Sequence, residues 1–299
     1  MALGASAPLD PASPSLVGEL RAMVDKEVAG KWGPYISTTG YSTPIYTVPA
    51  DEPVVHVSEE NPTPSPTLQA AFDAVPIPPG AQPAAGSDAQ LTVWQPSRDR
   101  LWEFWGLSRQ ADGWHARWGG AMERLSESPG YFSASAWPGA QYNWGATATS
   151  LPLVGGLITL KDLQKGQIDH AVALSLPVTD AGVWSWPAQR TDGSGTSPTA
   201  IPEGARFRLD PALNIAALGL PTLTRMIAVA AQRYGIVVRD TSGVVDFYGE
   251  DPTPTGTNPW KAATGGQPIW ALLSQLPWAH LEALRLTPCS KQPCPTPTG

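Results

Sequence analysis

Charged side chains are scarce in this sequence. Lys, Arg, Asp and Glu make up 15% of the 299 residues, against about a quarter in typical globular proteins. The balance is acidic, with a formal net charge of −7. Nucleic acid is bound through a basic face, so we expect no nucleic-acid partner.

Long apolar runs are absent as well. No run approaches the roughly 18 apolar residues that a membrane-spanning helix needs, so we expect no membrane partner. Residues 1–10 lack the charged and apolar regions of a signal peptide. We interpret Met1 as a start placed after a removed signal.

The sequence also lacks the common catalytic and cofactor motifs. It contains no P-loop, no G-x-S-x-G elbow, no H-E-x-x-H pattern and no dinucleotide fingerprint. Its four histidines are spread along the chain, which makes a histidine-based metal centre a minor option. We therefore expect no cofactor, although a structural Ca²⁺ held by loop carboxylates and carbonyls would leave no sequence signature.

Only two cysteines are present. Cys289 and Cys294 are close in sequence, and no further Cys or nearby His completes a zinc site. We predict a disulfide, a bond that persists outside the cytosol, and therefore a secreted, extracellular protein. The Pro/Thr alternation that follows is typical of a linker, and it predicts an attached C-terminal binding module or wall anchor in the parent protein. The alternative is a simple disordered terminus.

Turn-forming residues are abundant, with 29 Gly and 33 Pro, and they favour many short strands. We predict a mainly β protein with an antiparallel two-sheet sandwich of jelly-roll type, decorated with two to four helices. The expected organisation is an N-terminal helix packed on the domain (1–30), a single β-rich catalytic or binding domain (31–288), and a disulfide-closed end that starts a Pro/Thr linker (289–299).

Helical spacing of apolar residues predicts a few helices. They cover Ser13 to Gly30, Leu160–Gln164, Pro221–Tyr234, and a region from Pro268 to Leu284 that Pro277 interrupts. Strands bounded by turn residues are expected at Leu91–Trp94, Leu101–Leu107, Trp114–Gly119, Ile168–Leu176, Ala205–Asp210, Ile236–Asp240 and Val244–Tyr248. Asp112-Gly113 is a hairpin signal, and Ser242-Gly243 is a weaker one.

The 13 tryptophans suit the binding of sugar rings, although filling a large core accounts for part of them. Trp105, Trp114 and Trp118 are the candidate substrate-binding residues. Strand alternation places Trp114 and Trp118 on one face, about 13 Å apart. A hairpin with its tryptophans turned inward is an equal alternative.

Three carboxylates and one histidine are candidate catalytic residues. Glu103 shares a strand face with Trp105, an arrangement that can raise a carboxyl pKa. Asp169 precedes small residues that leave space for a cleft floor, and Asp240 ends a predicted strand. His170 is a candidate base. The alternatives are an ordinary edge-facing Glu103 and a His170 buried in the core.

Polar residues on two more strands favour a second chemistry. Arg206 and Arg208 share one strand face and can neutralise a carboxylate substrate. His170 or Tyr248 would then remove a proton. The alternative is that both arginines form solvated surface pairs.

Several of these segments together resemble a family of secreted bacterial proteins of the actinobacterial type. The resembling stretches are Trp114–Gly120, Ala146–Ile158, Gly166–Leu174, Trp186–Ala188, Gly204–Leu209 and Arg233–Asp240. The family pattern has a His after W-P-A where this chain has Gln189-Arg190. The resemblance implies secretion and one compact domain, and it assigns no catalytic role.

The leading functional hypothesis is a secreted carbohydrate-active enzyme, a glycoside hydrolase that acts on an extracellular polysaccharide or cell-wall glycan. It would use a carboxylate pair and tryptophan stacking. A polysaccharide lyase with an arginine neutraliser and a His or Tyr base is one alternative. A non-catalytic carbohydrate-binding or cell-surface module is the other.

Overall fold

The computed structural model describes residues 2–296, and within them the chain forms two compact units. Unit 1 combines residues 2–37, 156–249 and 258–296, and unit 2 combines Thr38–Gly155 with Glu250–Thr257. The sequence predicted one domain over residues 31–288. That the two units act together as one domain stays a prediction. Met1 and the end of the predicted linker, 297–299, lie outside the described residues.

Unit 1 is built on a six-stranded sheet with the order β1-β13-β9-β12-β11-β15. Its strands are β1 (Tyr35–Ser37), β9 (Val172–Leu176), β11 (Arg206–Leu209), β12 (Ile236–Thr241), β13 (Asp246–Tyr248) and β15 (Leu281–Ala283). All five residues of β9 are buried, as expected for a central strand covered on both faces. A separate pair, β10 (Trp184–Ser185) and β16 (Pro288–Cys289), is antiparallel.

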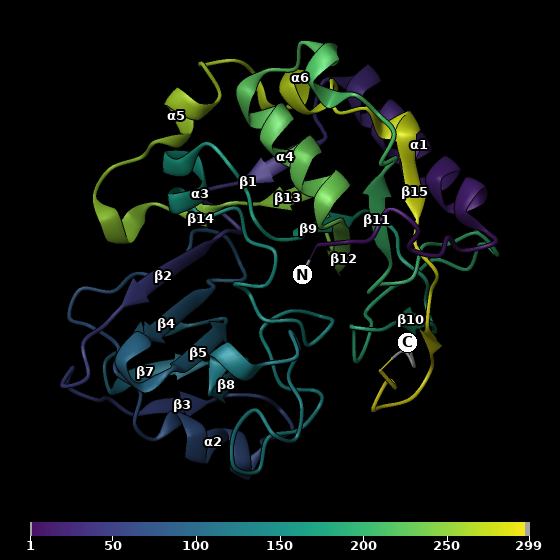
Figure 1. The fold of residues 1–299 in the computed structure, drawn as a ribbon. Coiled ribbons are helices and arrows are strands. Elements are labelled where there is room, and N and C mark those ends of the chain that lie inside the picture. The colour runs from purple at the N-terminus through teal and green to yellow at the C-terminus, as the bar shows by residue number, and fades with distance from the viewer. Residues whose placement is uncertain (1, 297–299) are drawn as a thin grey trace. The chain divides into compact units, whose positions relative to one another are not determined.

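Helices cover this sheet because each presents one apolar face to it. α4 (Thr222–Arg233) buries Leu223, Ile227 and Ala231 and packs on β9 and β11 (Figure 1). α1 (Ser13–Gly30) packs on β15 through an apolar face that includes Leu20 and Val24. Unit 1 also contains α3 (Leu160–Lys165), α5 (Trp260–Ala263), α6 (Ile269–Leu273) and two 3₁₀ turns, Ile215–Leu218 and Trp278–His280.

The order of the central strands differs from the sequence prediction. β12 is parallel to β9, and β13 is antiparallel to β9 on its other side. The predicted hairpin at Ser242-Gly243 is therefore wrong, because β9 lies between the two strands that these residues connect. The pairing partner comes from a segment about sixty residues earlier, which local turn chemistry does not encode.

Unit 2 contains a five-stranded sheet and a three-stranded sheet, with the orders β14-β2-β4-β5-β8 and β3-β7-β6. The strands are β2 (Thr43–Thr47), β3 (Val57–Glu59), β4 (Leu91–Gln95), β5 (Arg100–Trp105), β6 (Ser108–Gln110), β7 (Gly113–Ala116), β8 (Trp118–Glu123) and β14 (Glu250–Asp251). α2 (Pro66–Phe72) packs its Phe72 ring 4.8 Å from that of Phe104 on β5. The 3₁₀ turns are Pro96–Arg98, Leu125–Glu127 and Thr253–Thr255.

The described chain is mainly β, with four sheets and six α-helices. Both large sheets contain parallel as well as antiparallel pairs, so the predicted antiparallel pairing holds for only some of the strands. The jelly-roll arrangement is not confirmed. Two strand boundaries also differ: the segment expected to start at Ile168 becomes a strand at Val172, and Trp114–Gly119 is divided between β7 and β8.

The cysteine prediction is confirmed, because Cys289 and Cys294 form a disulfide. The bond lies in a small cluster of unit 1 with Trp184 and Ala188. None of the helices formed by residues 2–296 has the length and apolar character needed to cross a membrane.

Candidate acidic centre

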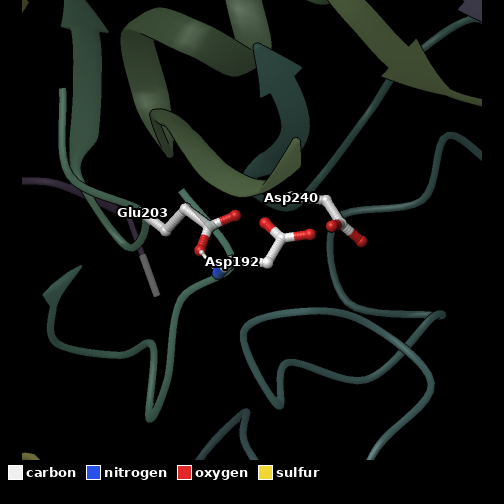
Figure 2. Close-up of side chains that lie close together, drawn as sticks. All are labelled: Asp192, Glu203 and Asp240. Carbon is white, nitrogen blue, oxygen red and sulfur yellow. Dashed lines mark hydrogen bonds between the residues drawn. The ribbon is translucent and has the colours of Figure 1, made fainter. Parts of the chain in front are cut away.

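Three carboxylates from separate segments of unit 1 meet in the structure. One oxygen from each of Asp192, Glu203 and Asp240 lies within 4.8 Å of the others. In the view of Figure 2 the Asp192 carboxylate lies between the other two. Asp192 is exposed, Asp240 is half-buried and Glu203 is fully buried. We call this group the acidic centre.

Backbone geometry fixes the position of Glu203. Its carbonyl accepts the Ser185 N–H at 2.7 Å, and the next residue, Gly204, donates its N–H to the Val238 carbonyl at 2.7 Å. Gly204 has φ of 84°, and a Cβ there would lie 1.7 Å from the Ser185 carbonyl oxygen. Only glycine fits such a left-handed, closely packed position, so Gly204 holds the Glu203 side chain beside β12.

Asp192 reaches the centre from a glycine-rich loop. Its backbone N–H donates to Glu203 Oε2 at 3.3 Å. The Thr241 hydroxyl contacts both carboxylate oxygens of Asp192, at 2.9 and 3.0 Å. The loop therefore ties Asp192 to β12 through its side chain and to Glu203 through its backbone.

Asp240 owes its direction to an irregularity in β12. The register with β9 shifts between Val238 and Asp240, and such a bulge turns the following side chains away from simple alternation. Asp240 also accepts the Thr241 N–H at 3.0 Å. The preceding Arg239 is buried and lies over the Tyr248 ring, 3.7 Å from its centroid.

The surroundings of Glu203 work against its charged form. Burial, the largest cause, and the charges of Asp240 and Asp192 together raise the pKa of Glu203 to about 9, although hydrogen bonds from Thr191 and the Asp192 N–H oppose the shift. Glu203 Oε1 is buried and has no hydrogen-bond partner among residues 2–296. Burying a charged carboxylate oxygen that has no hydrogen-bond donor costs free energy. Glu203 Oε1 is therefore suited to hold either a proton or a cation.

Glu103, one of the predicted catalytic residues, lies in unit 2 and is fully buried. Its two carboxylate oxygens accept the backbone N–H groups of Ala146 and Leu153, each at 2.8 Å. These contacts anchor the segment that covers one face of β5. A catalytic role for Glu103 stays a prediction.

Asp169 and His170 lie close together in the chain, yet they have separate environments in unit 1. Asp169 is exposed and bonded to Lys165 and Gln167, and the Lys165 ammonium lowers the pKa of the Asp169 carboxyl. His170 Nε2 lies 3.0 Å from Asp162, the residue that closes the capping box of α3. The small residues that follow Asp169 include Ala173 and Ser175, which are both buried, and a cleft beside them stays a prediction.

The three predicted tryptophans all lie in unit 2. Trp114 is buried in the core, and Trp105 and Trp118 are half-buried. Trp114 and Trp118 belong to β7 and β8 of different sheets, so the prediction that they share one strand face is wrong. The structure instead pairs Trp105 with Trp118 directly across β5 and β8. Arg117 lies over the Trp105 ring, 5.4 Å from its centroid.

The residues predicted for a lyase already have protein partners. Arg206 donates to the Tyr234 carbonyl, and Arg208 pairs with Glu282 at 2.8 Å. Tyr248 is buried, and burial raises the pKa of its hydroxyl well above the usual range. Deprotonated Tyr248 is therefore disfavoured, and its role as a base stays a prediction.

Sequence reasoning found Asp240 but missed Asp192 and Glu203. Asp192 lies in the run Thr191-Asp192-Gly193-Ser194-Gly195, a polar loop of the kind that supplies oxygen ligands to hard cations. Glu203 immediately precedes one of the segments that carry the family resemblance. Nothing in the local pattern indicates that a bulge in β12 brings the three carboxylates together.

Comparison with known proteins adds no assignment. No family model, no curated protein and no solved structure matches the chain. The resemblance noted in the sequence thus stays a prediction, and the chemistry of the acidic centre depends on its own residues.

Proposed function

We propose that this protein is a secreted carbohydrate-active enzyme, a glycoside hydrolase that contacts its glycan at the acidic centre. The observation that carries the proposal is the pair of accessible carboxylates, exposed Asp192 and half-buried Asp240, with oxygens within 4.8 Å of one another. Hydrolysis of a glycosidic bond uses two carboxyl groups that flank the bond. Of the carboxylates predicted from the sequence, the proposal retains Asp240.

The spacing favours one stereochemical course. Retaining enzymes hold their two carboxyl groups about 5–5.5 Å apart, and inverting enzymes hold them about 6.5–9.5 Å apart to admit a water. The oxygens of Asp192 and Asp240 are within 4.8 Å, which supports retention. Glu203 is fully buried, so we give it a positioning role through its contact with the Asp192 backbone.

Release of reducing ends from a panel of extracellular polysaccharides tests the proposal. We expect Asp192→Asn and Asp240→Asn each to lower the rate by at least about 100-fold. Asp169→Asn is the matched control, because it makes the same change at an exposed aspartate elsewhere in unit 1. Full activity in both centre variants would overturn the proposal, and loss in Glu103→Gln or Asp169→Asn alone would favour the carboxylates predicted from the sequence.

One observation favours a second candidate, a carbohydrate-binding module without catalysis. Trp105 and Trp118 are cross-strand partners and are both half-buried, and partly exposed indole faces are suited to stack on sugar rings. Affinity electrophoresis in polysaccharide gels tests it. Retardation without product formation, abolished in Trp105→Ala or Trp118→Ala, would support binding alone.

A further inference from the structure

We propose that the acidic centre is a Ca²⁺ site, with Asp192, Glu203 and Asp240 each supplying a carboxylate oxygen. Two independent observations support the site. The first is the convergence of the three carboxylates from separate segments. The second is Glu203 Oε1, a buried oxygen without a hydrogen-bond partner among the described residues, which points toward the Asp192 carboxylate in Figure 2.

The donor atoms indicate the kind of cation. All three are carboxylate oxygens, the ligands of hard cations such as Ca²⁺ and Mg²⁺ rather than Zn²⁺ or Cu²⁺. Oxygens within 4.8 Å of one another can share one Ca²⁺, because two Ca²⁺–oxygen distances of about 2.3–2.6 Å span that separation. Three carboxylates on one ion suit Ca²⁺ better than Mg²⁺, because Mg²⁺ is usually bound through one or two carboxylates and keeps several waters.

The ion resolves an electrostatic conflict within the centre. Three carboxylates at this spacing repel one another, and Glu203 is the one without solvent. A divalent cation removes the repulsion and gives Glu203 Oε1 a partner. Two hydrogen bonds fix the positions of these carboxylates. The Thr241 hydroxyl donates to the Asp192 carboxylate, and the Asp192 N–H donates to Glu203 Oε2.

The site leaves room for further ligands. Ca²⁺ takes six to eight oxygens as a rule, and Asp192 is exposed, so water or sugar hydroxyls can complete the coordination on that side. In this respect the inference rests on the proposed function: each carboxylate gives the ion one oxygen, so the ion would orient a glycan beside the second oxygens of Asp192 and Asp240. Binding of the ion itself does not depend on it.

Calorimetric titration of the metal-free protein with CaCl₂ tests the site, together with the shift in Tm that CaCl₂ produces. We expect binding of one ion and a rise in Tm with CaCl₂ concentration. Glu203→Gln and Asp192→Asn should each weaken Ca²⁺ binding at least about tenfold. Asp169→Asn, the same change at an exposed aspartate of unit 1, should bind as the wild type does.

Absence of wild-type binding at millimolar CaCl₂, or unchanged affinity in Asp192→Asn and Glu203→Gln, would overturn the site.

Failure of this inference is distinguishable from failure of the proposed function. Ca²⁺ binding without glycan hydrolysis or glycan binding rejects the function and leaves the site. Hydrolysis that is lost in Asp192→Asn, but is unaffected by EDTA in a wild type that binds no Ca²⁺, rejects the site and leaves the function.

Discussion

Glu103 of unit 2 and Glu203 of unit 1 are both fully buried. They differ in their hydrogen-bond donors and in the charges beside them. Glu103 receives two backbone N–H donors, one on each oxygen. Glu203 receives its contacts on one side, has an unpartnered Oε1 and lies beside two more carboxylates. Both Glu103 oxygens therefore have hydrogen-bond donors, whereas Glu203 Oε1 has none among the described residues.

The comparison shows that burial by itself does not identify a functional carboxylate. Hydrogen-bond donors offset the cost of burying a charge, and Glu103 has them. Where donors are missing, the group keeps a proton or binds a cation, as the raised pKa of Glu203 indicates. The following predictions test that distinction, from the largest expected effect to the smallest.

Removing the Glu103 carboxylate should produce the largest loss of stability. In Glu103→Ala the N–H groups of Ala146 and Leu153 lose their acceptors inside unit 2. We expect the free energy of unfolding to fall by about 3–5 kcal/mol, measured by urea denaturation. Glu103→Gln should be intermediate, because an amide offers one acceptor where two are needed. If Glu103→Ala lowered the free energy of unfolding by less than about 1 kcal/mol, the two backbone donors would not stabilise Glu103 as this comparison with Glu203 requires.

Glu203 should make the metal-free protein less stable as the pH rises. Its pKa is about 9 in the folded state against 4.5 for an unperturbed Glu, so the folded state binds the extra proton. This stabilisation is complete below about pH 4.5 and is lost as the pH rises toward 9. The slope should be about 1.4 kcal/mol per pH unit.

The Glu203→Gln variant separates Glu203 from other groups between about pH 7 and 9. Burial also raises the pKa values of Glu27 and Asp246, each to about 7, and their contributions are therefore lost mainly below that window. Against the effect of burial, hydrogen bonds to aspartates raise the pKa values of His115 and His170, which affect both proteins alike. Urea denaturation in EDTA should give a steeper decline for the wild type than for Glu203→Gln. An equal slope in both proteins would contradict the assignment.

Asp192→Asn should have a smaller effect in the absence of metal. The variant removes one of the charges that raise the Glu203 pKa, and an asparagine oxygen can still accept from Thr241. We expect the stability at pH 7 to change by less than about 1 kcal/mol. Because the Glu203 pKa is lower in this variant, the decline of stability with pH should level off at a lower pH than in the wild type. A decline that levels off at a higher pH, measured in the same denaturation series, would argue against repulsion within the acidic centre.

Asp169→Asn should produce no measurable change in stability. Asp169 is exposed, and its partner Lys165 extends from the same surface segment. Exposed pairs of this kind contribute little, because solvent screens them. A clear loss of stability in urea would show that this region is more tightly coupled to the fold than its exposure indicates.

Local features of the fold were readable from the sequence. The apolar period of α4, the short helix α3 and the disulfide all depend on residues close together in the chain. Sheet order was not readable, because β1 pairs in parallel with β13, more than two hundred residues away. Such pairings are decided by competition among strands of similar composition, which alternation does not resolve.

The sequence predicted only one residue of the acidic centre, Asp240, because the other two lie outside any regular pattern. Asp240 ends a strand that the sequence predicts, whereas Asp192 and Glu203 lie in loops with no periodic pattern. Their meeting requires the left-handed backbone at Gly204 and the register shift in β12. Both features emerge from packing, and a single sequence does not reveal either.

The division of the chain into units has a consequence for the order in which the protein assembles. All of unit 2 except residues 250–257 is contained in the continuous stretch Thr38–Gly155, so this stretch can fold before the second half of the chain has left the ribosome. Unit 1 needs β1 from the start of the chain and β15 from near its end. The acidic centre, formed by residues between 192 and 240, therefore assembles after most of unit 2 is able to fold.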